Sequence, residues 1–218
     1  MSKGNVSASV IKRLPRYYRF LGGLIDQNIV RISSGELANR MGLTASQIRQ
    51  DLNCFGGFGQ QGYGYNVHQL YDEIGEILGL NSHFGAIIIG AGNLGRAVAN
   101  YLSSERRGFH LMGIFDKKEA LAGQLIKGQP VRHISGLDEF CRAYKPDVAV
   151  LCLPYAAAAD TAEQLVRLGV KGFWNFSHYD LSLKYPDIPV ENVHLSDSLM
   201  QFCYKVKESK KQQNENQN

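Results

Sequence analysis

A glycine-rich segment in the middle of the chain has residue types and spacing that suit dinucleotide binding. The segment follows the apolar run Phe84–Ile89. In such a pattern, successive glycines permit a tight turn, a close approach to a pyrophosphate and close packing of the next helix on the strand. The N–H groups that open the helix favour a bound anion. We therefore predict a dinucleotide site at Gly90, Ala91, Gly92, Asn93, Leu94 and Gly95.

The acid Asp116 indicates which dinucleotide the site takes. It ends the next predicted strand, 26 residues past Gly90. A carboxylate there accepts hydrogen bonds from the adenosine ribose and repels a 2′-phosphate, which favours NAD(H) over NADP. Lys117 and Lys118 could neutralise such a phosphate, so NADP or another nucleotide stays open.

Three more residues are expected beside the nicotinamide half of the ligand. Ligands of parallel sheets lie outside the carboxyl ends of the strands. Pro154 follows one predicted strand at that edge, and Asn175 and Phe176 end another. Core packing is the competing interpretation of Phe176.

A second group of residues suits the reading of DNA bases. On a helix from Ala45 to Phe55, the apolar side chains share one narrow arc. The polar ones point away from it, and such groups pair with base edges, Gln with adenine and Arg with guanine. We predict base contacts from Ser46, Gln47, Arg49, Gln50 and Asn53, although an ordinary solvated face would look similar.

The elements around that helix predict a winged helix-turn-helix. Ser33-x-x-Glu36 and Thr44-x-x-Gln47 are capping boxes that start two short helices, with Gly42 in the turn between them. Aromatic residues alternate with glycines over 55–67, which predicts a hairpin wing with its tip near Gln60-Gln61-Gly62. Further DNA contacts are predicted at Arg13, Arg16, Ser33 and Ser34, which would hold phosphates, and at Gln60, Gln61 and Tyr63 of the wing.

The charge distribution supports a polyanion partner at the N-terminal end. Residues 1–50 carry eight Lys or Arg against two acids, a larger excess than the +4 of the whole chain. Double-stranded operator DNA is the predicted partner.

After the first helices, strands and helices alternate, which predicts an α/β fold with a Rossmann-type, doubly wound parallel sheet. Strands are expected at 84–89, 110–115, 147–153 and 170–176, and helices at 94–103, 137–144 and 156–168. The predicted organisation is a winged-helix domain at 1–80, a Rossmann domain at 84–194, a C-terminal helix at 195–208 and a disordered tail at 209–218.

Composition excludes several classes of protein. No stretch approaches the roughly 18 apolar residues of a membrane span, and the first residues lack the apolar core of a secretory signal. The four cysteines form no Cys-x-x-Cys pair. We therefore expect no metal site, no membrane partner and a cytoplasmic location.

These segments together resemble the Rex family of redox-sensing transcriptional repressors over nearly the whole chain. Besides the glycine-rich loop, the resemblance rests on the segments 11–19, 31–34, 62–67 and 175–176. It implies a homodimer with N-terminal winged helices, central NAD(H)-binding domains and a C-terminal helix swapped onto the partner. It also implies that NADH releases operator DNA, whereas NAD⁺ permits or favours DNA binding.

Some positions depart from the family pattern. Gln60-Gln61 and Gln50 stand where many members carry basic residues, so phosphate attraction and its salt dependence should be weaker. Some members couple their domains through an Arg–Asp–Tyr switch, which Arg19 and Tyr101 match in part. His194 stands where the Asp is expected, and whether the nearby Asp197 replaces it is left open.

Two other functions stay compatible with the residues. An NAD-dependent oxidoreductase fused to a DNA-binding module would need an acid or base near the nicotinamide. His178 and Tyr179 are the candidates that we find, and we predict no catalytic residue. A repressor that senses another nucleotide, such as a coenzyme A thioester, is the third option.

Overall fold

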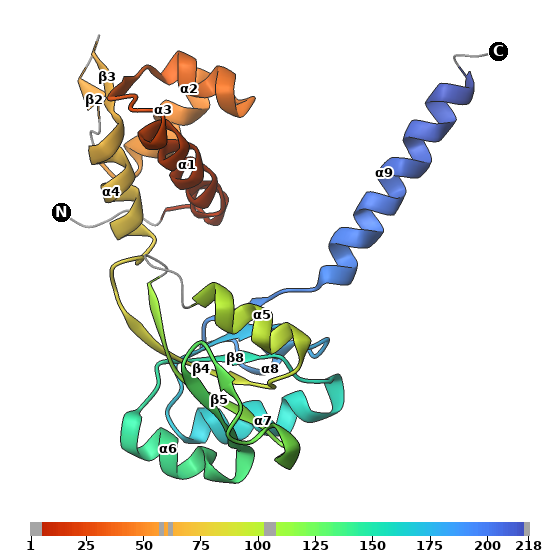
Figure 1. The fold of residues 1–218 in the computed structure, drawn as a ribbon. Helices are drawn as coiled ribbons and strands as arrows, with labels where there is room; N and C mark the ends of the chain where they lie inside the picture. The colour runs from red at the N-terminus through yellow and green to blue at the C-terminus, as the bar shows by residue number, and fades with distance from the viewer. Residues whose placement is uncertain (1–5, 57–58, 61–62, 103–107, 216–218) are drawn as a thin grey trace. The chain divides into compact units, whose positions relative to one another are not determined.

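The computed structural model describes residues 6–56, 59–60, 63–102 and 108–215. The chain divides into two compact units, Met1–Ser82 and His83–Asn218. Each is described by itself (Figure 1).

The N-terminal unit is a helix-turn-helix with a small antiparallel sheet. Its elements are α1 (Ala8–Asp26), β1 (Arg31–Ile32), α2 (Ser34–Met41), α3 (Ala45–Asn53), β2 (Gly59–Gln60), β3 (Gly64–Asn66) and α4 (Val67–Ile77). Strand β3 lies between β1 and β2. The β2–β3 hairpin confirms the predicted wing, whose expected tip at Gln61 and Gly62 lies outside the described residues. Strand β1 was not predicted, because two residues are too few to show an alternating pattern.

One apolar core holds the four helices of this unit together. Helix α1 supplies Leu14, Tyr17 and Leu21, each 0% exposed, and includes Pro15 within its length. The other helices contribute their own apolar stripes, with Leu37 and Met41 from α2, Ile48 and Leu52 from α3, and Leu70 and Ile74 from α4. This packing fixes which face of α3 is turned outwards.

The C-terminal unit is a parallel sheet with helices on both faces. Its elements are β4 (Phe84–Ile89), α5 (Asn93–Leu102), β5 (Phe109–Asp116), η1 (Glu119–Leu121), β6 (Leu125–Ile126), β7 (Gln129–His133), η2 (Ile134–Gly136), α6 (Leu137–Tyr144), β8 (Val148–Leu151), α7 (Tyr155–Arg167), β9 (Gly172–Asn175), α8 (Leu181–Lys184), β10 (Val190–Asn192) and α9 (Leu195–Glu215). The strand order is β10-β9-β8-β4-β5-β7-β6, and only the β6–β7 pair is antiparallel. This confirms the predicted doubly wound fold, whereas β6, β7 and β10 were not predicted.

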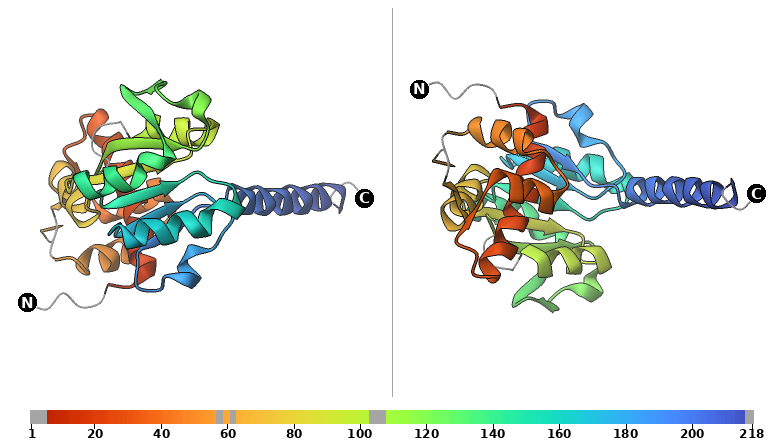
Figure 2. Two further views of the ribbon diagram at one scale, coloured as in Figure 1. Left: turned by 90° about the horizontal axis from the view of Figure 1, so that it is seen from below. Right: turned by 90° about the horizontal axis from the view of Figure 1, so that it is seen from above.

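The two faces of the sheet bury different side chains of the same strands. Ile87 and Ile89 of β4 pack with α6 and α7, whereas Ala86 and Ile88 pack with α5. Figures 1 and 2 show α5 on one side of the sheet and α6 and α7 on the other. Burial on both faces explains why β4 is apolar without alternation.

Helix α9 runs to Glu215, so the prediction of disorder from residue 209 was wrong for residues 209–215. The segment has no apolar periodicity, but it consists largely of Lys, Gln and Glu, which have good helix propensity. The apolar side chains of α9 are exposed, with Leu195, Leu199, Phe202 and Val206 at spacings of four, three and four.

Candidate functional site

The turn between α2 and α3 has the geometry that its sequence predicts. The Ser33 side chain accepts from the Glu36 N–H while the Glu36 carboxylate accepts from the Ser33 N–H, a complete capping box. Gly42 ends α2 in the left-handed conformation, with φ 63°. The Thr44 hydroxyl then accepts from the Gln47 N–H and starts α3, but the Gln47 side chain donates to Asp51, and the reciprocal bond of the predicted capping box is not formed. These caps fix where α3 begins and therefore which residues it presents.

Four of the predicted base-contacting residues lie exposed on α3. Ser46, Arg49, Gln50 and Asn53 are exposed, while Ile48 and Leu52 face the core. The Arg49 Nη1 donates to the Ser34 hydroxyl of α2 at 3.0 Å, so the two predicted contact residues stand side by side. The face therefore offers donors and acceptors of the kind that read base edges.

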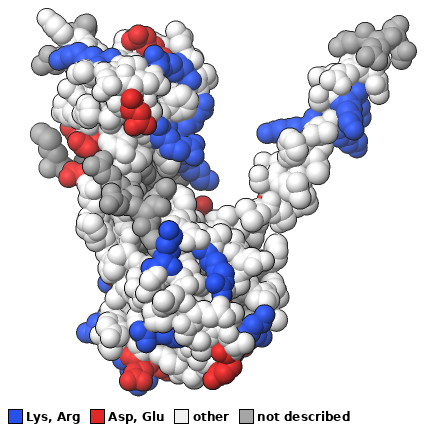
Figure 3. Space-filling model, in the orientation of Figure 1, with Lys and Arg blue, Asp and Glu red and all other residues white. Residues whose placement is uncertain are grey.

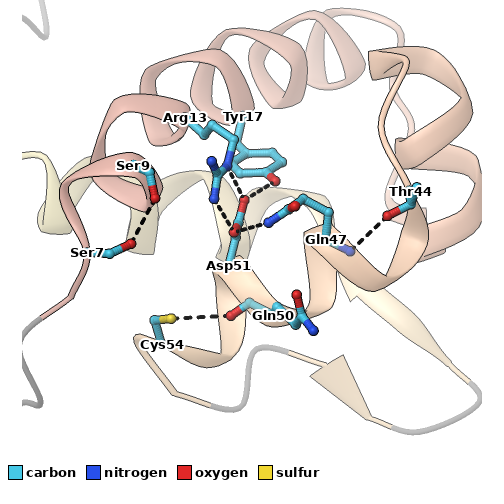
Figure 4. Close-up of polar contacts among 9 residues, drawn as sticks. All are labelled: Ser7, Ser9, Arg13, Tyr17, Thr44, Gln47, Gln50, Asp51 and Cys54. Carbon is cyan, nitrogen blue, oxygen red and sulfur yellow. Dashed lines mark hydrogen bonds and ion pairs between the residues drawn. The ribbon is translucent and has the colours of Figure 1, made fainter.

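The buried carboxylate of Asp51 was not predicted, and it anchors α3 to α1 (Figure 4). Asp51 is 1% exposed. Its oxygens accept from Arg13 Nε and Nη2 at 2.7 Å each, from the Tyr17 hydroxyl at 2.7 Å and from Gln47 Nε2 at 2.8 Å. A weak sequence signal existed, because Asp51 borders the apolar arc of the helix, about 60° from Ile48 at 100° per residue.

This network engages two of the residues that are predicted to contact DNA, Arg13 and Gln47. The guanidinium of Arg13, whose side chain is 30% exposed, is paired with Asp51, and the Gln47 amide is held by the same carboxylate. Both side chains satisfy a buried charge, which would otherwise cost several kcal/mol. Arg13 and Gln47 therefore hold α3 in place through Asp51, and their contacts with DNA stay a prediction.

Hydrogen bonding decides the ionisation of Asp51. Burial alone would raise its pKa, but donation from Arg13, Tyr17 and Gln47 outweighs burial, and the pKa lies below its ordinary value. Burial and the bond to Asp51 raise the pKa of Tyr17. The Asp51 contact raises the pKa of Arg13, which stays cationic. The network is therefore a charged pair at neutral pH.

Among the described side chains, the remaining predicted phosphate and wing contacts are exposed or partly exposed. Arg16 is exposed and donates through Nη2 to the Met41 carbonyl at the end of α2. Tyr63 is 70% exposed, and Arg31 donates to its carbonyl at 3.3 Å with the guanidinium 6.0 Å from its ring. For Gln60 only the backbone is described, and Gln61 lies outside the described residues. Figure 3 shows Lys and Arg side chains along one edge of this unit.

The glycine-rich loop of the second unit is as tight as its sequence predicts. Gly90 has φ +103°, and a Cβ there would lie 2.3 Å from the Cys152 carbonyl oxygen. A Cβ on Gly95 would lie 1.8 Å from the Gly90 carbonyl oxygen, while one on Gly92 would meet nothing within 4 Å. Gly92, Asn93 and Leu94 are exposed, so the backbone at the start of α5 is accessible to a ligand.

Asp116 lies beside this loop at the end of β5. Its Oδ2 accepts from the Ala91 N–H at 2.6 Å and its Oδ1 from the Lys118 N–H at 2.9 Å. The residue is partly exposed, and Lys117 and Lys118 after it are exposed. Each carboxylate oxygen has a second lone pair, so Asp116 can still accept from ribose hydroxyls.

The three residues predicted beside the nicotinamide behave differently from one another. Pro154 is exposed at the N-cap of α7, and Phe176 is partly buried with its ring 4.9 Å from that of Trp174. Asn175 is 0% exposed, and its amide bonds to Tyr179, Asn192 and twice to Ser177. Those four bonds use its full capacity, so the prediction that Asn175 borders the ligand directly is corrected: it shapes the loop after β9.

The three predicted switch residues are divided between the units, with Arg19 in the first and Tyr101 and His194 in the second. Arg19 lies in the N-terminal unit and, with Arg40, partly lines a hollow of about 450 Å³. In the second unit Tyr101 is 48% exposed, with its ring 6.2 Å from that of Trp174. The His194 ring stacks on His178 at 5.9 Å, and its buried Nδ1 has no hydrogen-bond partner among the described residues. Their pairing stays a prediction.

Within the described residues, no helix is long and apolar enough to cross a membrane. No group of three or more metal-ligating side chains occurs in that part of the chain. The four cysteines are free, and burial raises the pKa of Cys152 to about 12 and of Cys141 to about 11, which keeps both thiols protonated.

Comparison with known proteins finds similarities in both units. A family model described as "Putative DNA-binding protein N-terminus" matches residues 5–53, and one described as "CoA binding domain" matches residues 81–179. The redox-sensing transcriptional repressor Rex of Thermoanaerobacter pseudethanolicus is 53% identical over 206 residues, which cover 94% of this chain and 92% of the relative. The Rex protein of Caldicellulosiruptor saccharolyticus is 48% identical, with 94% of each chain covered.

Solved structures resemble this chain over nearly its whole length. A crystal structure of RSP in complex with β-NAD⁺ and operator DNA has a TM-score of 0.88 at 50% identity, with 96% of each chain covered. A structure of RSP with β-NADH has a TM-score of 0.85 at 48% identity, covering 96% of this chain and 98% of that chain. From these identities and this coverage, the chain belongs to the Rex family of redox-sensing transcriptional repressors.

Proposed function

We propose that the protein is a redox-sensing repressor that binds palindromic operator DNA and releases it when NADH occupies the Rossmann unit. The observation that carries the proposal is the match, near 50% identity over 96% of the chain, to RSP, which has been crystallised with β-NAD⁺ and operator DNA and with β-NADH. The exposed face of α3 and the open glycine loop supply the two kinds of binding surface that this function requires.

The DNA contacts are assigned to polar side chains of the helix-turn-helix and of the wing. Base edges are read by Ser46, Arg49, Gln50 and Asn53 of α3. Phosphates are held by Arg16, Ser33, Ser34 and the wing residues Gln60, Gln61 and Tyr63. Contacts of the first kind give sequence preference, and contacts of the second kind give register and salt dependence.

The dinucleotide is assigned to the carboxyl edge of the sheet. The loop from Gly90 to Gly95 presents backbone N–H groups to the pyrophosphate, and Asp116 accepts from the adenosine ribose. Pro154 and Phe176 border the nicotinamide half. Asp116 carries a negative charge next to the ribose, so NAD(H) is preferred over NADP(H).

The repressor acts as a homodimer, since palindromic half-sites call for two-fold symmetry. Helix α9 has an exposed apolar face, whose exposure to water is unfavourable. It consists of Leu195, Leu199, Phe202 and Val206. We assign it to packing against the second protomer, as a swapped helix. NADH then needs only to bind better to the arrangement of protomers that no longer fits the operator.

The experiment is a gel-shift titration on a palindromic, A·T-rich duplex, with NAD⁺ and NADH varied at a fixed total. Operator binding should persist in NAD⁺ and be lost in NADH, and by linkage DNA should weaken NADH binding by the same factor. If the affinity for the operator stayed unchanged in saturating NADH, the proposal would be wrong.

One observation favours a second ligand, namely the match of residues 81–179 to the CoA binding domain model. The same titration therefore needs an arm with coenzyme A and its acetyl thioester. Release of the operator by these compounds, and not by NADH, would show that the Rossmann unit senses coenzyme A or its thioester instead of NADH. Because the chain is 53% identical to a Rex protein, we expect NADH to be the ligand that releases the operator.

We further infer that the protein is not an enzyme and acts in the cytoplasm, where its DNA partner lies. His178 is exposed after β9 and Tyr179 is partly buried there, with its N–H donating to Ser177. Oxidation of NADH by the purified protein with any member of a metabolite panel would contradict this inference.

A further inference from the structure

We propose that Arg96 is a positioning residue that clamps the glycine-rich loop to the segment after β5, and so sets the affinity for the ADP half of the dinucleotide. The inference rests on the proposed function. It names a residue outside the glycine motif and outside the sites predicted above.

The clamp consists of two hydrogen bonds from one guanidinium. Arg96, in the first turns of α5, donates through Nε to the Ala91 carbonyl at 3.1 Å and through Nη2 to Gln124 Oε1 at 2.6 Å. The Gln124 amide in turn donates to the Ala120 carbonyl at 2.9 Å. A planar, forked side chain can hold two acceptors in fixed positions, which a lysine cannot do.

The second acceptor is itself anchored to the sheet. The Gln124 carbonyl accepts from the Val131 N–H of β7 at 2.9 Å, and its N–H donates to the Leu121 carbonyl at 3.1 Å. Arg96 therefore ties the loop after β4 to the edge of the sheet on the β5–β7 side. This is the side on which Asp116 stands.

Both polar groups of the Ala91 residue are held by charged side chains of opposite sign. Its N–H donates to Asp116 at 2.6 Å, and its carbonyl accepts from Arg96 at 3.1 Å. Ala91 is 0% exposed, whereas Gly92 and Asn93 next to it are exposed. Arg96 thus holds the loop from its inner side and leaves the outer side to the ligand.

A loop held in its binding conformation loses less entropy when the ligand arrives. Every ligand that contains the ADP half meets this loop, so loss of the clamp should weaken all of them by one factor. The preference between NADH and NAD⁺, which depends on the nicotinamide, should stay unchanged. The concentration at which the repressor responds would shift, but its redox selectivity would not.

The test measures binding of ADP-ribose, NAD⁺ and NADH by calorimetry for the full-length protein and four variants. Arg96→Met keeps the apolar stem, Gln124→Leu removes the second acceptor, and the double variant completes a mutant cycle. Arg142→Met on α6, 76% exposed, is the matched control. We expect about a tenfold loss for Arg96→Met, about threefold for Gln124→Leu, and no further loss in the double variant.

Two further readouts separate positioning from general stability. Without ligand, the unfolding midpoint of the variants should match that of the control, while amide exchange over residues 90–95 should accelerate. Unchanged ligand affinity, a loss confined to one ligand, or additive effects in the cycle would overturn the proposal. Should Arg96→Met fail to fold, Gln124→Leu alone still decides, because Gln124 is exposed.

Failure of the proposed function gives a different result. Wild-type protein that binds none of the three ligands would refute dinucleotide sensing itself. The clamp would then be judged by the exchange rates of the loop in Arg96→Met against Arg142→Met, and equal rates would refute it.

Discussion

Two aspartates, one in each unit, differ in how their carboxylates are satisfied. Asp51 is 1% exposed and accepts from three side chains, one of them a bidentate arginine. Asp116 is partly exposed, and its described contacts are two backbone N–H groups. Side-chain partners use up the first carboxylate inside the fold, while backbone donors orient the second and leave lone pairs for a ligand. An acid near a functional surface is therefore interpreted from its partners and not from its position alone.

The largest effect should follow from removing the buried carboxylate. Asp51→Ala leaves Arg13, Tyr17 and Gln47 without their common acceptor, which should destabilise the N-terminal unit by about 3 kcal/mol. Amide exchange in α1 and α3 measures this loss, and operator binding should weaken in parallel. The control is Asp72→Ala on α4, where the carboxylate is exposed.

The comparison predicts that this damage stays within one unit. NADH binding by Asp51→Ala should match wild type, since the Rossmann unit has its own core. If the amide exchange rates of α1 and α3 were the same in Asp51→Ala and Asp72→Ala, the Asp51 network would not be needed for stability. The contrast drawn between Asp51 and Asp116 would then be wrong.

The next prediction compares two glycines of the loop, Gly95, which packs closely against the Gly90 backbone, and Gly92, which is exposed to the ligand. Gly95→Ala places a Cβ 1.8 Å from the Gly90 carbonyl oxygen, so both the fold and NADH binding should suffer, with about 1–3 kcal/mol lost in stability. Gly92→Ala meets nothing within 4 Å, so stability should stay unchanged while NADH binding falls, because only the ligand comes close there. Thermal unfolding and calorimetry measure the two quantities. Full NADH affinity in Gly92→Ala would place the pyrophosphate elsewhere.

A loss of similar size, in operator binding rather than in stability, is expected from the exposed face of α3. Arg49→Ala should cost about 1–3 kcal/mol of operator binding and relax sequence preference if the guanidinium reads a base. Arg40→Ala on α2 removes the same charge beside the hollow that Arg19 lines, and it should leave preference intact. Competition with operators altered one base pair at a time provides the measurement. A uniform loss across all sequences would assign Arg49 to a phosphate instead.

The sequence predicts what local chemistry encodes and misses what depends on distant partners. The Ser33 capping box, the Gly90–Gly95 loop and the β4 strand were predictable, because each is written in consecutive residues. The Arg13–Asp51 pair joins positions 38 apart, and no local pattern distinguishes an arginine that meets a buried acid from one that meets a phosphate. Asn175 was misassigned for the same reason, since its saturating partners include Asn192 on another strand.

The smallest expected effect is an acid sensitivity that differs between the units. Hydrogen bonds hold the pKa of Asp51 below its unfolded value, so its stabilising contribution is complete above about pH 4 and fades as the pH falls through the lower, folded pKa. In Asp51→Asn, stability of the N-terminal unit should vary less with pH over that range. The bonds from Lys171 and from the Gly85 N–H likewise lower the pKa of Asp147 in the Rossmann unit. Asp147→Asn should therefore flatten the acid dependence of that unit alone, as followed by exchange at graded pH. If the stability of the N-terminal unit varied with pH in the same way in wild type and Asp51→Asn, ionisation of Asp51 would contribute nothing to that stability. The contact between α3 and α1 would then depend on packing and not on charge.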